Sequence, residues 1–193
     1  MGAEIMMGTW GSRVSEIAPI KIDGITNAMA GITYPHLELH GGTHYVYRSY
    51  ASVSKNAVKD ILIVTPDSTK FGHFIVGFSF TGGQTLLALY EGVTTSNDGT
   101  EKTVRNRRRP TGDDATLKIY QDPTVSGGAV AENILQDGVF GINDKKSFGG
   151  GDRDNEEIIL NPATKYLLRA DELDVAAMYY NFFFDWYEHT DKR

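Results

Sequence analysis

Alternation of apolar and polar residues predicts a chain made mostly of β-strands. In residues 71–80, FGHFIVGFSF, the residues Phe74, Val76, Phe78 and Phe80 fall on one face, which is the period of a strand with one buried side. The run at 176–189 has one wholly apolar alternating set: Met178, Tyr180, Phe182, Phe184 and Trp186. We expect the last four of these to lie in the core.

Turn residues separate further short runs that favour strands. These runs are rich in β-branched, aromatic or aliphatic residues and cover 45–53, 59–65, 85–91, 115–121, 156–160 and 164–170. Pro66-Asp67 and Asn161-Pro162 mark turns between them. Roughly eight or nine short strands without a long amphipathic helix are typical of a β-sandwich or barrel. The predicted fold class is therefore all-β, an antiparallel β-sandwich with a jelly-roll-like arrangement.

Two segments lack this alternation. Residues 1–40 contain irregularly spaced glycines and two prolines, so we expect an extended N-terminal arm with short strands at best. The sandwich domain would then occupy 41–193. Residues 126–155 are glycine-rich and polar, which predicts a long exposed loop.

Composition and charge bear on disulfide formation, membrane association and nucleic-acid binding. The 193 residues carry a formal net charge of −6 and no cysteine, so no disulfide framework is expected. The N-terminus has no basic region followed by an apolar run, and no window approaches the ~18 apolar residues of a membrane span. We therefore expect synthesis in the cytosol and no membrane partner. The acidic balance argues against nonspecific nucleic-acid binding.

Candidate metal ligands give little support to a metal site. His36, His40 and His44 are spaced by four, but Pro35 and Gly41 argue against a helix through them. On a strand the same spacing separates side chains by about 13 Å, too far to share an ion. The acidic loop Asp152–Glu156 lacks the spacing of a calcium-binding EF-hand. We expect no metal, although ion binding by the 149–156 loop stays open.

No catalytic constellation is apparent either. The chain has no Gly-x-Ser-x-Gly motif, no cysteine nucleophile and no phosphate-binding loop. We expect no enzyme activity, no catalytic residue and no cofactor.

The most distinctive polar motif is TVRNRRRPTGDD, residues 103–114, which contains Arg105, Arg107, Arg108 and Arg109. It follows a turn and precedes a predicted strand, so it should lie on a connection or a sheet edge. Three interpretations remain: a solvated loop paired with Asp113 and Asp114, a nucleic-acid patch, or a protein contact. A run without interleaved aromatic residues disfavours nucleic acid. Arginine forks bind carboxylates in bidentate fashion and are enriched at interfaces, which favours a protein contact.

The order of motifs resembles a family of tailed-bacteriophage virion structural proteins, of the head decoration (cement) type. The resemblance rests on TPD (65–67), EGVTTSNDGT (91–100), the Asn-Arg-x-Arg run at 106–109, DPTV (122–125) and WYEH (186–189). It implies a homotrimer that binds the major capsid protein on the outer head surface and stabilises capsomer contacts. The protein would assemble in the host cytoplasm, reside on the virion and make no direct contact with nucleic acid.

The resemblance also suggests contact residues. The arginine loop, Arg105 to Arg109 with Asn106, and the arm with Trp10 would touch the capsid or a sister subunit, and the arm would gain order there. Tyr45 and Tyr47 are further candidates, with Tyr50, Tyr179 and Tyr187, although each tyrosine could equally be core. The alternative is a tail or baseplate sandwich that binds a host receptor or glycan. Aromatic platforms for a glycan could come from Trp10, Trp186 or Tyr187.

Overall fold

A computed structural model describes residues 21–22, 29–30, 34–54, 57–81, 84–110, 112–140, 148–150, 157–173 and 178–190. The chain divides into two compact units, Met1–Leu37 and Glu38–Arg193. In the first unit, β1 (Lys21–Ile22) and β2 (Met29–Ala30) form an antiparallel pair. Most of the predicted arm, with Trp10, lies outside the described residues.

Helix α1 (Tyr34–Gly41) corrects the expectation that Pro35 would exclude a helix. Pro35 lies in the first turn, where a backbone N–H has no intrahelical acceptor, so proline is tolerated there. Gly42 ends the helix with a φ of 83° and donates its N–H to the Glu38 carbonyl at 3.1 Å. None of the helices in the described part of the chain is long and apolar enough to cross a bilayer.

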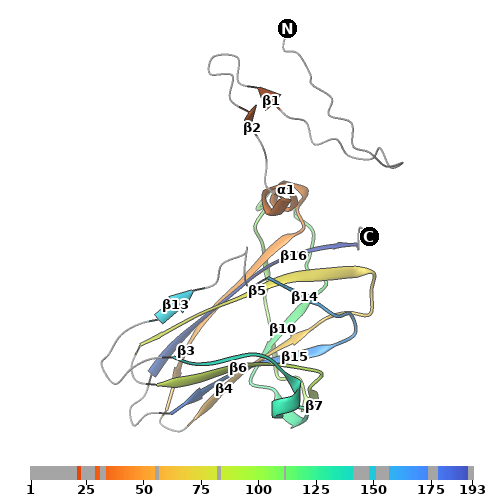
Figure 1. Ribbon diagram of the computed structural model, residues 1–193. Helices are drawn as coiled ribbons and strands as arrows, with labels where there is room; N and C mark the ends of the chain where they lie inside the picture. Colours follow the sequence, from red (N-terminus) through yellow and green to blue (C-terminus); the bar gives the residue numbers. More distant parts are fainter. Residues whose placement is uncertain are drawn as a thin grey trace. The chain divides into compact units, whose positions relative to one another are not determined.

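The second unit is a sandwich of two antiparallel sheets (Figure 1). The first, called the β16 sheet, has the order β13-β5-β16-β3-β9, and β14 also pairs with β5. Its strands are β3 (His44–Val53), β5 (Lys70–Thr81), β9 (Arg105–Asn106), β13 (Phe148–Gly150), β14 (Ile158–Leu160) and β16 (Met178–Thr190).

The second sheet, called the β15 sheet, has the order β12-β6-β15-β4-β10-β8. Its strands are β4 (Val58–Val64), β6 (Thr85–Glu91), β8 (Thr100–Lys102), β10 (Lys118–Gln121), β12 (Ile134–Phe140) and β15 (Lys165–Glu172). Along the chain the main strands alternate between the two sheets, except that the consecutive strands β6 and β12 pair within one sheet. Strands β3, β5, β13/β14 and β16 form one sheet, and β4, β6, β12 and β15 form the other. This alternation is the jelly-roll arrangement, so the predicted fold class is confirmed.

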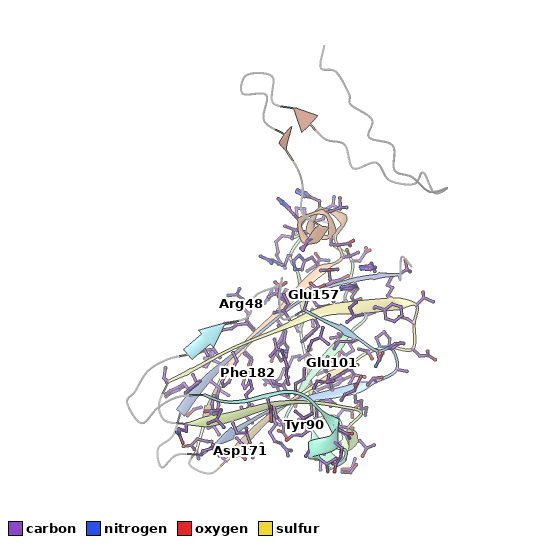
Figure 2. All side chains as sticks on the ribbon, viewed as in Figure 1. Arg48, Tyr90, Glu101, Glu157, Asp171 and Phe182 are labelled. Carbon is purple, nitrogen blue, oxygen red and sulfur yellow. The ribbon has the colours of Figure 1, made fainter. Side chains whose placement is uncertain are left out.

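The core lies between the sheets and is built largely from aromatic rings (Figure 2). The four residues predicted from the alternation of β16 are all fully buried: Tyr180, Phe182, Phe184 and Trp186. Phe74 of β5 packs against Phe184 and Trp186, with ring centroids 5.3 and 5.4 Å apart. Each such ring contributes on the order of 1.5–3 kcal/mol through burial.

Residues 92–133 form an insertion between β6 and β12 that packs on the sandwich. Its strands β7 (Thr94–Asn97) and β11 (Thr124–Gly127) pair with each other, and a 3-10 turn follows at Ala131–Asn133. Leu62 and Leu167 lie on the outer face of the β15 sheet, yet both are fully buried in a cluster with Val93 of the insertion. The insertion also extends both sheets at one edge, through β8 and β10 in the β15 sheet and β9 in the β16 sheet.

The prediction of one long loop over 126–155 was wrong in part. Strand β12 lies within that range and pairs with β6, and the short β13 pairs with β5. Gln136, Asp137 and Gly138 interrupt the apolar pattern of β12 because it is an edge strand. The 151–156 segment, with the acidic residues considered for calcium, lies outside the described residues.

Candidate interaction site

The arginine loop, residues 103–115, crosses from the edge of one sheet to the edge of the other. Strand β8 ends at Lys102 on the β15 sheet, and β9 begins at Arg105 on the β16 sheet. In β9, Asn106 is opposite Tyr45 and Arg105 opposite Val46 of β3. The Arg107 N–H then donates to the His44 carbonyl at 2.8 Å. The predicted position on a sheet edge is therefore correct.

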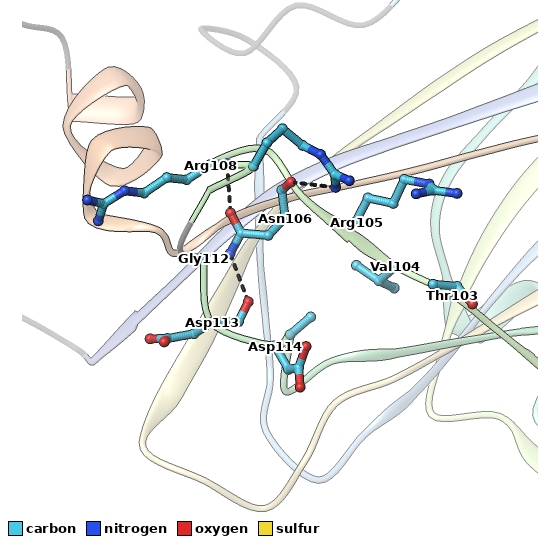
Figure 3. Close-up of a pocket in the computed structure, with 10 residues that line it drawn as sticks. Thr103, Val104, Arg105, Asn106, Arg108, Gly112, Asp113 and Asp114 are labelled. Carbon is cyan, nitrogen blue, oxygen red and sulfur yellow. Dashed lines mark hydrogen bonds between the residues drawn. The ribbon is translucent and has the colours of Figure 1, made fainter.

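Asn106 organises this loop from its centre (Figure 3). Its Nδ2 donates to the carbonyls of Gly42 at 2.6 Å and Asp113 at 2.8 Å, while its Oδ1 accepts the Arg108 N–H at 2.8 Å. A Cβ at Gly112 would lie 2.1 Å from Asn106 Cγ, so glycine is required there. These contacts hold both limbs of the loop together without using any arginine side chain.

The arginine side chains have different surroundings. Arg107 Nη1 donates to Asp185 Oδ2 at 2.9 Å, and Asp185 Oδ1 lies 2.7 Å from His44 Nε2. Arg109 Nη1 lies 3.5 Å from the Asn106 carbonyl oxygen. Arg105 and Arg108 are exposed, and no side-chain hydrogen bond or ion pair is found for either within the described residues. The carboxylate that pairs with this run is Asp185, 78 residues away, rather than Asp113 or Asp114.

A pocket of about 260 Å³ opens on the loop. It is lined by Thr103, Val104, Arg105, Asn106, Arg108, Arg109, Gly112, Asp113, Asp114 and Ala115. Arg105, Arg108 and Arg109 are thus among the residues that line one cavity, while the Arg107 side chain pairs with Asp185 on the sheet face. The cavity can receive a small anionic group, such as a partner carboxylate.

Glu188 anchors the chain where it leaves the loop. Its carboxylate is 2% exposed and accepts four hydrogen bonds. These come from Thr116 N at 2.9 Å, Thr116 Oγ1 at 2.6 Å, Leu117 N at 3.1 Å and Trp186 Nε1 at 3.0 Å. A buried carboxylate is tolerated when its oxygens are satisfied in this way. Glu188 thus fixes the exit of the loop to the end of β16.

Tyr45 and Tyr47 prove to be core residues, 2% and 6% exposed, so they are corrected as candidates for a contact surface. Tyr45 Oη donates to the Asp114 carbonyl at 3.3 Å, and burial, with Glu188 and Asp113 nearby, raises the pKa of its phenol. Tyr47 Oη accepts from Gln121 Nε2 at 2.8 Å, and burial likewise raises its pKa. Both rings brace β3 beneath the arginine loop rather than facing a partner.

The histidines spaced by four do not come together on one element. His36 and His40 lie in α1, whereas His44 is buried at the start of β3 against Asp185. On the same sheet face, His73 Nδ1 lies 2.7 Å from Glu157 Oε1, which also accepts the Tyr187 hydroxyl at 2.8 Å. Across the described ranges, no three His, Asp or Glu side chains are placed to hold a metal ion.

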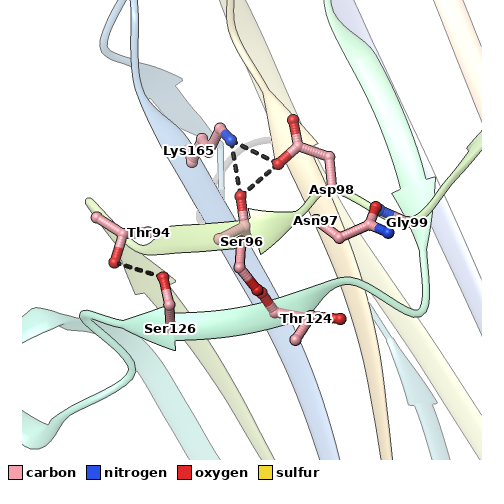
Figure 4. Close-up of polar contacts among 9 residues, drawn as sticks. Thr94, Ser96, Asn97, Asp98, Gly99, Thr124, Ser126 and Lys165 are labelled. Atoms are coloured by element: carbon pink, nitrogen blue, oxygen red, sulfur yellow. Dashed lines mark hydrogen bonds and ion pairs between the residues drawn. The ribbon is translucent and has the colours of Figure 1, made fainter.

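A second polar cluster lies at the other end of the insertion (Figure 4). Lys165 Nζ donates to Thr95 Oγ1 at 2.7 Å and pairs with Asp98 Oδ1 at 2.5 Å. Hydrogen bonds from Lys165 and Thr95 hold the pKa of the Asp98 carboxyl below its ordinary value. The sequence shows Asp98 only as part of a turn, because its cation lies 67 residues further along the chain.

Two of the other tyrosines named as contact candidates, Tyr50 and Tyr179, do lie on the exposed outer side of the β16 sheet. Tyr50 and Tyr179 are highly exposed, and Arg48 lies over the ring of Phe183. Trp186 and Tyr187, considered above as glycan platforms, are instead buried. The alternation in β16 predicts this outer side, because the positions that alternate with the core set begin at Tyr179; the contact of Arg48 with Phe183 depends on the pairing of β3 with β16 and is not visible in the sequence.

Comparisons with known proteins give no family. No protein-family model matches the chain, and no curated protein sequence matches it. Among solved structures, a chain from "Structure of infectious bursal disease virus Gx strain" aligns with this chain at 13% identity and a TM-score of 0.15. The alignment covers 90% of this chain and 45% of that one, so this chain spans less than half of its length. A TM-score this low carries no argument about fold or function.

Proposed function

We propose that this protein decorates the outer surface of a tailed-phage head, where it binds the major capsid protein as a homotrimer and stabilises capsomer contacts. The observation that carries the proposal is the edge of the sandwich at β9. There, Arg105 and Arg108 present exposed guanidinium groups on a loop whose backbone is already fixed by Asn106. The resemblance of the sequence motifs to decoration proteins supports the same function.

Preorganisation is what makes this edge suitable for binding. A loop that is ordered before association loses less conformational entropy on binding than a mobile one. Guanidinium forks match carboxylates in geometry, and the pocket beside them gives room for an acidic side chain. Each copy would contribute a moderate contact, and attachment through several subunits would raise the apparent affinity by effective concentration. Such a role requires neither catalysis nor a cofactor.

Binding to purified heads tests the proposal. Undecorated expanded heads are incubated with wild-type protein and with an Arg105→Ser/Arg108→Ser variant, and occupancy is measured by electron cryo-microscopy. We expect saturable binding at symmetry-related surface positions, and at least tenfold weaker binding for the variant. Lys118→Ser is the matched control, because Lys118 pairs with Glu101 on the β15 sheet at 3.1 Å. Absence of wild-type protein from heads together with its recovery in tails would support the tail or baseplate alternative.

A gel shift separates protein contact from nucleic-acid contact. If the guanidinium groups serve a capsid carboxylate, double-stranded DNA should not be retained at physiological ionic strength. Salt-sensitive retention of DNA that is lost in the Arg105→Ser/Arg108→Ser variant would contradict the proposal, since phosphate binding depends strongly on salt.

A further inference from the structure

Two exposed tyrosines occupy diagonal positions on the outer face of the β16 sheet. Tyr50 of β3 is 77% exposed and Tyr179 of β16 is 58% exposed. Tyr50 is opposite Asn181, and Tyr179 is opposite Ser52, so the two rings are diagonal neighbours on one face. Aromatic side chains usually gain stability by burial. Two that remain in water next to each other therefore point to a ligand.

An arginine is fixed beside these rings. The Arg48 guanidinium carbon lies 5.3 Å from the ring centroid of Phe183, its cross-strand partner. Phe183 in turn packs over Gly77 of β5, where an added Cβ would lie 3.2 Å from Phe183 Cβ. The Phe183 ring is therefore held in place by packing against Gly77, and the cation–π contact orients the Arg48 guanidinium group over that ring. Arg48 is itself exposed (Figure 2), so its N–H groups can reach a ligand.

The positions around the tyrosines are small and neutral. Asn181 Nδ2 donates to Ser79 Oγ of β5 at 3.2 Å. Ser52 and Thr81 are the two cross-strand partners of Tyr179. Arg48 is the single charged side chain among the nine adjacent outer positions of β3, β16 and β5: residues 48, 50, 52, 179, 181, 183, 77, 79 and 81. The patch thus combines rings, hydroxyls, an amide and one cation.

We propose that this patch binds an acidic sugar, a glycan unit that carries a carboxylate. The apolar C–H face of a sugar ring would lie on Tyr50 and Tyr179, since tyrosine offers a rigid, amphipathic contact surface. The sugar hydroxyls would exchange hydrogen bonds with Asn181 and the neighbouring serine. The carboxylate would pair with Arg48, whose planar guanidinium group can donate hydrogen bonds to both carboxylate oxygens at once.

Charge and composition favour this ligand over a polymer of phosphates. A nucleic-acid strand carries one negative charge per nucleotide, whereas the patch offers one cation in a chain of net charge −6. Serine is depleted at protein interfaces, whereas two of the positions around these rings are Ser52 and Ser79. The sugar patch is separate from the pocket of the arginine loop, so it does not depend on head decoration.

Titration with one defined probe tests the proposal. The full-length protein is titrated with the trisaccharide of galacturonic acid by calorimetry, and its fully methyl-esterified form provides the uncharged match. We expect measurable binding of the acid at millimolar concentration or below, and at least tenfold weaker binding of the ester. Tyr50→Ala, Tyr179→Ala and Arg48→Gln should each weaken binding of the acid about tenfold. Lys118→Gln, on the other sheet, should leave it unchanged.

Several results would overturn the acidic-sugar site. These are no heat of binding for either trisaccharide, equal affinity for acid and ester, or full binding by the Tyr50→Ala variant. Binding of a dT12 oligonucleotide that depends on Tyr50 would assign the patch to nucleic acid. Concentration-dependent self-association that Tyr50→Ala abolishes, measured by sedimentation velocity, would assign it to a second copy of the chain. Circular dichroism of each variant checks that it remains folded.

Discussion

Two regions of the insertion at 92–133, the β7–β11 pair and the arginine loop, differ in whether their charged side chains have partners within the protein. At the β7–β11 end, Asp98 is paired with Lys165 and Thr95, and Val93 helps to bury Leu62 and Leu167. At the arginine loop, hydrogen bonds of Asn106 fix the backbone, while Arg105 and Arg108 extend into solvent.

The comparison shows how one inserted segment can serve two purposes. Charges that find partners within the chain, as at Asp98, attach the insertion to the sandwich. Charges that are held on a fixed backbone without an internal partner remain available for binding. A run of arginines is therefore informative only when the structure shows which of them is used internally. Here Arg107 pairs with the Asp185 carboxylate, whose other oxygen contacts His44.

The largest loss of stability is expected for a substitution that disrupts the packing of the β7–β11 pair against the β15 sheet. Leu167→Ala removes a fully buried side chain between the β15 sheet and the insertion. The free energy of unfolding, measured by urea denaturation, should fall by about 3 kcal/mol because a cavity remains. Val139→Ala is the matched control, since Val139 is 61% exposed on edge strand β12. An equal loss for both variants would mean that the insertion is not packed as described.

The next effect concerns the fixed backbone of the arginine loop. Asn106→Ala removes two donors and one acceptor, and stability should fall by about 1–3 kcal/mol. Hydrogen exchange of the Arg108 amide, which donates to Asn106 Oδ1, should become much faster. Asn106→Asp keeps that acceptor but loses both donated bonds, so it should preserve slow exchange at Arg108 better than alanine does. Unchanged exchange in Asn106→Ala would show that the loop is held by other contacts.

A smaller effect is expected for the ion pair of Asp98 with Lys165. The pKa of Asp98 is lowered in the folded protein, so the folded state binds fewer protons than the unfolded state as pH falls. The pair's contribution is complete above about pH 5 and is lost as pH falls through the lowered pKa. Both side chains are about one-third exposed, so solvent screens the pair. The free energy of unfolding of the wild type should therefore exceed that of Asp98→Asn by only about 0–1 kcal/mol at pH 7. A difference that grows toward pH 3 would contradict this sign.

The smallest change in stability is expected for the two exposed arginines, which we propose serve binding and not folding. Arg105→Ser/Arg108→Ser should change the free energy of unfolding by less than about 0.5 kcal/mol, because neither guanidinium group has a partner in the described chain. The same variant should lose head binding. A substantial loss of stability in urea would show that these arginines serve the fold.

The sequence by itself determined the two longest strands, β5 and β16, and which of their faces are buried. The alternation in β5 and β16 placed Phe74, Phe78, Phe80 and the aromatic set of β16 in the core, as the structure has them. The turn before Thr100 and the strand after Ala115 also placed the arginine run on an edge. These properties follow from local period and turn chemistry, which each segment carries on its own.

Only the tertiary structure decided what those segments meet. Strand β12 exists because β6 offers it a paired edge, and α1 begins despite Pro35 because the first turn needs no donor there. Arg107 is paired because β9 brings it to Asp185, and Tyr50 becomes a neighbour of Tyr179 through the register of β3 with β16. Pairing partners that are distant along the chain leave no local trace, because a strand's sequence specifies its buried face but not its neighbour.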